Sequence, residues 1–88
     1  MAEAEAPETR LKRLRMRSTR RGIREMDLIL TAFATAELDR LTEADLLLYD
    51  QLLNENDQDL YAWVTGQNAA PEAFRGMVAK ISSALQRN

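Results

Sequence analysis

The sequence predicts an all-α protein, a single small bundle of about five short helices. Apolar residues recur at intervals of three and four in several segments, whereas no segment shows the alternation with period two that is typical of strands. The chain has 88 residues, of which 45% are hydrophobic and 30% charged, with three glycines and two prolines. This is the composition of a folded chain, and its length fits one domain.

The N-terminal part is expected to contain a tail and one polar helix. Residues 1–8 are acidic and lack helical periodicity, so we expect a flexible acidic N-terminal tail, with residues 9–88 forming the helical domain. The first helix is expected to begin near Thr9, with Leu11 and Leu14 on its apolar face. Gly22 is expected to end it, because glycine adopts the left-handed conformation at low cost.

Two helices are expected in the middle of the chain. The second should run from about Ile23 to Glu37, and its apolar stripe consists of Ile23, Met26, Leu30 and Phe33. Thr42 is expected to cap the third, because its hydroxyl can accept a hydrogen bond from a free backbone N–H. The apolar side of this third helix consists of Leu46, Tyr49, Leu52 and Leu53.

The C-terminal part is expected to hold two more helices. Asp57 should cap a short fourth helix that Gly66 closes, and Tyr61 and Trp63 in it should face opposite ways, one to the core and one to the rim. Pro71 suits the first position of the last helix, where a missing N–H costs nothing. The apolar positions of that helix are Phe74, Met77, Val78, Ile81 and Leu85.

The residue types present exclude several kinds of enzyme site. These 88 residues contain no histidine and no cysteine, so a Ser-His-Asp triad, a Cys-His dyad and a zinc site of His or Cys ligands cannot form. The glycines are isolated, which excludes a phosphate-binding loop. Residues 54–59 resemble the start of a calcium loop but lack its sixth-position glycine. We expect no enzyme activity, no metal and no stably bound cofactor.

Charge is distributed unevenly along the chain. The net charge is −2, yet residues 10–24 contain eight basic residues and no acid, whereas residues 25–74 contain eleven acids and one base. The basic segment can be a solvated helix, a nucleic-acid-binding surface or a docking surface for an acidic protein face. It contains no aromatic residue for base stacking, so a small helical nucleic-acid-binding regulator is the weaker alternative.

Nothing in the sequence predicts a membrane or secreted protein. No apolar run approaches the roughly 18–20 residues that span a bilayer, and the acidic start does not resemble a secretory signal. We expect a cytoplasmic protein.

Two short segments carry a family resemblance. Residues 17–27 contain Arg21, Gly22 and Glu25 followed by Met26 and Asp27, which resembles the Arg-Gly-x-x-Glu motif of the succinate dehydrogenase flavinylation and assembly factor family. Residues 52–66, with Leu-Leu and then Asp-Gln-Asp-Leu-Tyr-Ala-Trp and a closing glycine, are similar to a second segment of that family. The resemblance covers about residues 10–66. Gln58 stands where the family often has proline, and Thr19 and Arg20 stand where it has bulkier residues.

The resemblance implies a chaperone-like assembly factor rather than an enzyme. Members bind the flavoprotein subunit of succinate dehydrogenase, and in some bacteria that of fumarate reductase, and promote covalent attachment of FAD to a histidine of that subunit. FAD would therefore be the group attached to the partner. We expect the free protein to be a monomer that binds no nucleic acid.

The motif residues and the second segment define the expected partner-binding site. Arg21 and Arg24 are expected to pair with partner carboxylates and Glu25 with a cation, while Gly22 lets the partner backbone approach closely. Gly22→Arg should then abolish partner binding and leave the helical fold largely intact. The alternative for the motif alone is a helix end with an internal Arg21–Glu25 pair. The full expected set is Arg17, Arg20, Arg21, Gly22, Arg24, Glu25, Asp27, Asp57, Asp59 and Trp63.

Overall fold

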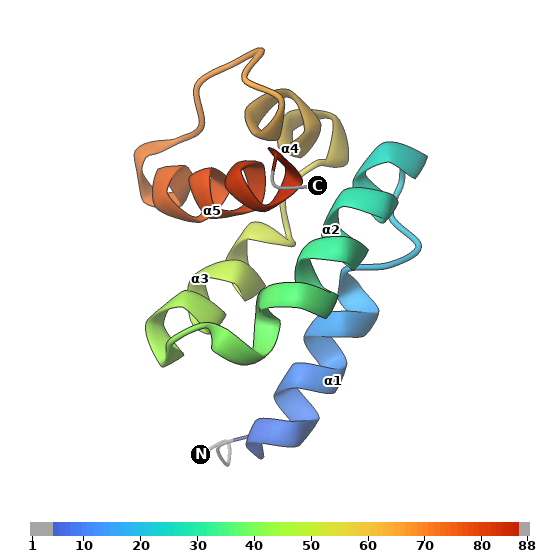
Figure 1. Ribbon diagram of the computed structural model, residues 1–88, viewed down its shortest axis with the longest axis vertical. Helices are drawn as coiled ribbons and strands as arrows, with labels where there is room; N and C mark the ends of the chain where they lie inside the picture. The colour runs from blue at the N-terminus through green and yellow to red at the C-terminus, as the bar shows by residue number, and fades with distance from the viewer. Residues whose placement is uncertain (1–4, 87–88) are drawn as a thin grey trace.

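The computed structural model describes residues 5–86, which contain five α-helices and no strand, so the all-α prediction is confirmed (Figure 1). Two short 3-10 helices accompany them: η1 extends α2, and η2 precedes α5. The bounds are α1 Pro7–Arg17, α2 Arg24–Glu37, η1 Leu38–Arg40, α3 Glu43–Leu52, α4 Asp57–Val64, η2 Glu72–Phe74 and α5 Arg75–Gln86.

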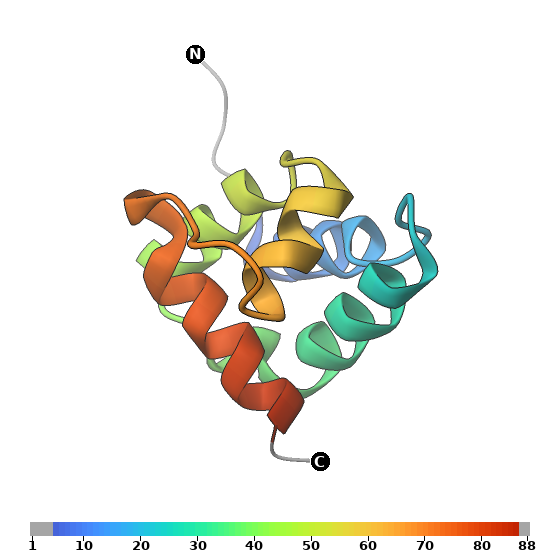
Figure 2. The ribbon, with the colours of Figure 1, turned by 90° about the horizontal axis from the view of Figure 1, so that it is seen from above.

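Helix α2 is the central element of the bundle. It contacts α1, α4 and α5, while α5 also packs against α3 and α4. In Figure 1, α1 lies at one end of the molecule, and α4 and α5 lie at the opposite end. Seen from above, α2 and α5 approach one another near the C-terminal end of α5 (Figure 2).

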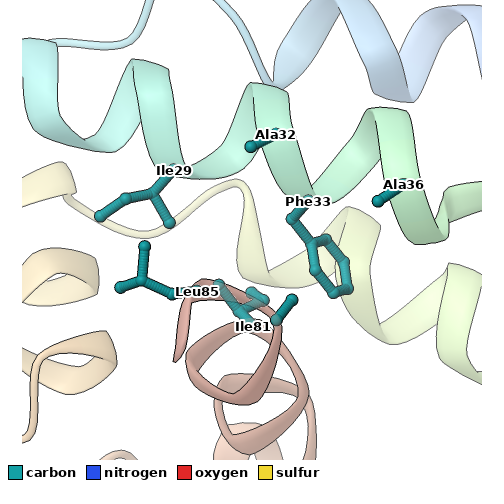
Figure 3. Close-up of a pocket in the computed structure, with 7 residues that line it drawn as sticks. Ile29, Ala32, Phe33, Ala36, Ile81 and Leu85 are labelled. Atoms are coloured by element: carbon teal, nitrogen blue, oxygen red, sulfur yellow. The ribbon is translucent and has the colours of Figure 1, made fainter. Parts of the chain in front are cut away.

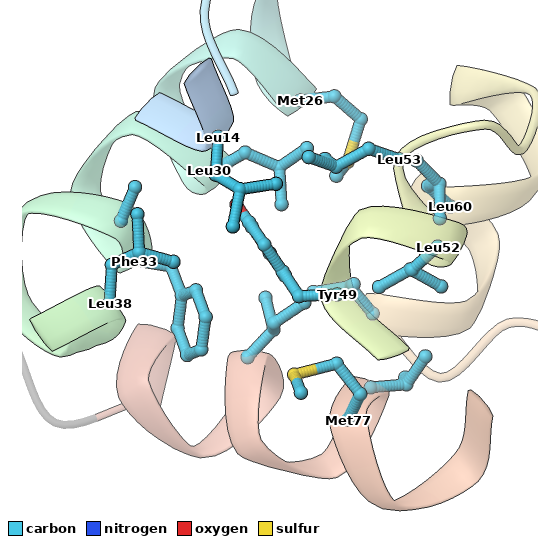
Figure 4. Close-up of a cluster of buried hydrophobic side chains, with 14 of the residues drawn as sticks. Leu14, Met26, Leu30, Phe33, Leu38, Tyr49, Leu52, Leu53, Leu60 and Met77 are labelled. Atoms are coloured by element: carbon cyan, nitrogen blue, oxygen red, sulfur yellow. The ribbon is translucent and has the colours of Figure 1, made fainter. Parts of the chain in front are cut away.

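The core is built from one apolar side of each helix, as the periodicity predicts. Tyr49 extends from α3 through the middle of the cluster toward Leu30 and Leu14 (Figure 4), and its ring lies 5.6 Å from that of Phe33. The helical residues of the core are Leu14, Met26, Leu30, Phe33, Ala34, Leu46, Tyr49, Leu52, Leu60, Val64, Met77, Val78 and Ile81.

A buried pair of hydroxyl groups ties the end of α1 to α3. Ser18 is fully buried, and its Oγ donates to the Leu14 carbonyl oxygen at 2.8 Å and lies 2.6 Å from the Tyr49 hydroxyl. Because Ser18 uses its one hydrogen on Leu14, Tyr49 is the donor to Ser18. Burial raises the pKa of Tyr49 to about 12, so this donor keeps its proton at neutral pH.

The boundaries of α1 differ from the expected ones at both ends. The helix begins at Pro7, two residues before the expected start, because proline fits the first turn. Pro7 and Glu8 of the expected tail are therefore helical, and residues 1–4 lie outside the described residues. After α1 it is Arg20, with φ 54°, that adopts the left-handed conformation, so the prediction for Gly22 is wrong in this respect.

The α4–α5 region also departs from expectation in three details. Asn56 rather than Asp57 caps α4, because its Oδ1 accepts from the Gln58 N–H at 2.8 Å. Tyr61 and Trp63 are both half-buried, so neither is a core residue. Pro71 precedes η2 rather than opening the last α-helix. The Thr42 cap of α3 and the end of α4 at Gly66 are confirmed, and Gly66 adopts the left-handed conformation.

Helix length bears on membrane insertion. The longest helix in residues 5–86 is α2 with 14 residues, and none in this range has the length and apolar character needed to cross a bilayer.

Candidate partner-binding site

The side chain of Arg21 connects the ends of three helices. Its Nε donates to Asp57 Oδ1 at 2.9 Å, its Nη1 to the Arg17 carbonyl oxygen at 2.9 Å and its Nη2 to the Leu53 carbonyl oxygen at 3.1 Å. The side chains of Arg21 and Asp57 are only 12% and 14% exposed. A guanidinium in this position uses its fixed fork of donors to hold the end of α1, the end of α3 and the start of α4 together.

Gly22 completes this arrangement from the backbone. Its N–H donates to Oδ2 of Asp57, so both carboxylate oxygens of Asp57 are held by neighbouring residues of one loop. A Cβ at position 22 would lie 2.8 Å from that oxygen, closer than van der Waals contact. A side chain at position 22 would therefore have to displace the Asp57 carboxylate, whereas the backbone conformation would tolerate one. We call Arg21, Gly22 and Asp57 the clasp.

The clasp changes two expectations about the motif. Arg21 is engaged inside the protein, whereas the sequence leads us to expect it at the surface of a partner. The space beside Gly22 is filled by the Asp57 carboxylate on one side, although Gly22 itself is exposed. Gly22→Arg must then disturb the clasp as well as any docking surface, so the expectation of a largely unaffected structure needs correction.

A second group of contacts fastens α1 to α3. Asp50 accepts from Arg13 through both oxygens, at 3.0 and 2.9 Å, and from Arg17. Hydrogen bonds from Arg13, together with the charges of Arg13 and Arg17, lower the pKa of Asp50. Arg17 also donates to Asn54 Oδ1 at 2.6 Å. Asp50 and Asn54 are not among the residues expected from the sequence. The sequence does contain a sign of this contact: Arg13 and Arg17 are four residues apart, as are Asp50 and Asn54. Residues at this spacing lie on the same face of a helix.

These contacts neutralise much of the basic segment. Arg10 pairs with Glu43 at 2.6 Å and Arg15 with Asp39 at 2.8 Å. With the pairs of Arg13, Arg17 and Arg21, five of the eight basic residues in 10–24 form ion pairs inside the protein. Lys12, Arg20 and Arg24 are exposed and form no ion pair among residues 5–86. The segment is therefore not a continuous basic surface.

Four residues of the motif region remain exposed at the loop and the first turn of α2. Arg20, Gly22, Arg24 and Glu25 are exposed, and we call them the exposed corner. Arg24 and Glu25 have no side-chain hydrogen bond or ion pair within the described part of the chain. The alternative of an internal Arg21–Glu25 pair is wrong, because the acid that Arg21 contacts is Asp57. The corner is not sealed inside the bundle.

The remaining expected residues are not part of the exposed corner. Asp27 is half-buried and accepts from the Thr31 hydroxyl at 3.2 Å. Asp59 is exposed in the first turn of α4. Trp63, about 9 Å further along α4 than Asp57, stacks on Phe74 with ring centroids 6.3 Å apart. Within residues 5–86, no three acidic side chains are grouped so that they could hold a metal ion.

The motif residues thus form a surface feature of a small helical bundle: four of them are exposed beside the clasp. Residues 12–85 match the model of a protein family described as "Flavinator of succinate dehydrogenase". The chain belongs to this family, and the matched range contains both the clasp and the exposed corner. This confirms the family resemblance found in the two sequence segments.

Individual relatives agree with the family match. The chain is 41% identical over 85 residues to "Succinate dehydrogenase assembly factor 2, mitochondrial" of Meyerozyma guilliermondii, covering 96% of this chain and 63% of that protein. It is 36% identical over 86 residues to the Danio rerio protein of the same name, covering 96% of this chain and 54% of that protein. It is 46% identical over 62 residues to "FAD assembly factor SdhE" of Legionella pneumophila, covering 70% and 78%. The chain thus spans about half to two thirds of the length of these mitochondrial relatives.

Proposed function

We propose that this chain is an assembly factor that binds the flavoprotein subunit of succinate dehydrogenase and promotes its covalent flavinylation with FAD. The family match and the names of the relatives support this function. The structural observation that carries it is the exposed corner: the clasp fixes the loop from inside, and Arg24 and Glu25 are left exposed without internal contacts.

The chemistry of flavinylation must be supplied by the partner. With no histidine in these 88 residues, this chain offers no histidyl acceptor for FAD. The protein would act by selecting the conformation of the flavoprotein subunit in which FAD and its acceptor are aligned. FAD is then the group attached to the partner, and this chain need not hold it.

The contacts of the clasp suit this role. Arg24 would pair with a carboxylate of the flavoprotein subunit and Glu25 with a cation near its flavin site. Because the clasp already orders the loop, docking orders little additional backbone, and less of the interaction free energy is lost to conformational entropy. In this proposal Arg21 and Asp57 act as positioning residues and do not contact the partner.

The proposed partner also indicates which other flavoproteins the chain would bind and where in the cell it would act. The fumarate reductase flavoprotein is a second candidate client, and a monomer that docks one to one is the expected form. The location should be the compartment in which the flavoprotein subunit receives FAD: the cytoplasm in a bacterium, and the mitochondrion for relatives that carry that word in their names.

The nucleic-acid-binding alternative is disfavoured by the ion pairs of α1. Arg10, Arg13, Arg15 and Arg17 contact acids of the same protein, so the helix lacks the continuous positive surface that phosphate binding needs. Salt-dependent binding of the purified protein to random duplex would support this alternative.

The test is complementation of a strain that lacks the protein. Denatured flavoprotein subunit is run on a gel and viewed under ultraviolet light, where covalent flavin fluoresces. Deletion should abolish the fluorescent band, wild type should restore it, and Glu25→Gln should not. Glu72→Gln is the matched control, because Glu72 is an exposed acid in η2, outside the motif. A fluorescent band of unchanged strength in the deletion strain would refute the proposed function.

A further inference from the structure

The outer face of α2 carries no charge beyond the motif. Residues 28–36 contain no charged residue, although Leu28 is 60% exposed and Ala32, Thr35 and Ala36 are exposed as well. The outward face of a surface helix is ordinarily charged or polar. Depletion of charge is instead characteristic of the centre of a protein–protein interface.

An apolar groove lies beside this face, between α2 and α5. It has a volume of about 130 Å³ and is lined by Ile29, Ala32, Phe33, Ala36, Ile81, Ala84 and Leu85. Figure 3 shows Ile29 of α2 and Leu85 of α5 pointing toward one another across it. Leu85 is 39% exposed, and all seven lining side chains are apolar. The lining side chains offer water no hydrogen-bond partner, so an apolar side chain would displace water from the groove favourably.

The groove begins one helical turn from the exposed corner. Glu25, Ile29 and Phe33 follow at intervals of four, which places them in one row along α2. The motif carboxylate is therefore one helical turn from the lining residue Ile29. The corner alone is too small to hold a partner, because a stable interface buries about 800 Å² on each side and involves roughly 20–30 residues. The uncharged face of α2 and the groove add to the surface available next to the corner.

We propose that the flavoprotein subunit docks along the outer face of α2, with Arg24 and Glu25 at the polar rim and one apolar side chain of that subunit inserted into the α2/α5 groove. This inference rests on the proposed function. It adds that the affinity comes chiefly from the uncharged face of α2 and the groove, and the correct register from the exposed corner.

The test compares two alanine-to-glutamate variants in binding to the purified apo flavoprotein subunit. Ala32 lines the groove and is exposed, so Ala32→Glu leaves its carboxylate in water in the free protein but buries it in the complex. It should raise the Kd by about tenfold or more. Ala44→Glu is the matched control: it is also exposed on a helix, in the first turn of α3, and should change the Kd less than about twofold. Both variants should unfold at the wild-type temperature.

Hydrogen exchange in the wild-type complex provides a second measurement. Amides of residues 28–36 and 81–86 should become protected when the flavoprotein subunit binds. If wild type binds but Ala32→Glu binds equally well, or these amides stay unprotected, the groove proposal is overturned and the proposed function stands. If wild type does not bind, both are overturned. A third outcome is that wild type is a dimer, that Ala32→Glu is a monomer, and that both bind the flavoprotein subunit equally well. The groove would then be occupied by a second copy of this chain, and the inference would be overturned.

Discussion

Replacing Gly22 by alanine should destabilise the protein even though Gly22 is exposed. The φ angle at this position is not in the left-handed region, so the backbone itself tolerates alanine. The new Cβ, however, would lie 2.8 Å from Oδ2 of Asp57. This carboxylate cannot swing away freely, because Arg21 holds its other oxygen. The substitution must therefore break the Gly22 N–H bond or displace the Arg21–Asp57 pair.

The expected cost follows from the bond that is lost. A hydrogen bond to a charged group contributes about 1.5–3 kcal/mol, while alanine in place of glycine returns about 0.4–1 kcal/mol by restricting the unfolded chain. The net loss in the free energy of unfolding is about 1–2 kcal/mol. For a domain of this size each kcal/mol corresponds to about 4–8 °C, so the melting temperature should fall by about 5–15 °C.

Thermal unfolding followed by circular dichroism measures this effect, with Gly76→Ala as the control. A Cβ at Gly76 of α5 meets nothing within 4 Å, so this variant should be more stable than wild type by about 0.5–1 kcal/mol. In an Asp57→Ala background the obstruction is gone, and Gly22→Ala should then be neutral or slightly stabilising. The reasoning is refuted if Gly22→Ala alone is as stable as wild type.

Three further predictions concern stability. Arg13 holds the pKa of Asp50 below its ordinary value, so the contribution of Asp50 is complete above the unfolded-state pKa of about 4 and is lost as the pH falls through the lowered folded-state value. Below about pH 5, the urea-unfolding midpoint of Asp50→Asn should therefore depend less on pH than that of wild type. A midpoint that falls as steeply with decreasing pH as in wild type would contradict this. Tyr49→Phe removes the donor to Ser18 and should cost about 1 kcal/mol in urea unfolding. An equally stable variant would show that the hydroxyl pair contributes nothing. Gly66 has φ 82°, and Gly66→Ala should lower the melting temperature by the equivalent of about 1–2 kcal/mol; an unchanged temperature would argue against strain there.

The helices and the core were predictable because apolar spacing is a local property of the sequence. The rows of Met26, Leu30 and Phe33 in α2 and of Met77, Val78 and Ile81 in α5 are buried as their periodicity requires. The Thr42 cap likewise depends only on neighbours in sequence. These features need no knowledge of how the helices meet.

The polar contacts were not predictable in this way, because they depend on tertiary structure. Asn56 and Asp57 are adjacent and both can cap a helix. Arg21, 36 residues away in sequence, holds Asp57, which leaves the cap to Asn56. Likewise, the basic segment looks like an exposed charge in the sequence but lies against acids such as Asp50 in the fold. Which motif residues stay exposed could only be decided from the structure.

Covalent incorporation of FAD into purified apo flavoprotein subunit, measured with and without this protein, tests the central claim most directly. Wild type should raise the rate of incorporation, whereas Glu25→Gln, which leaves the clasp intact, should not, although it unfolds at the same temperature. A Glu25→Gln variant as effective as wild type would contradict docking through the exposed corner.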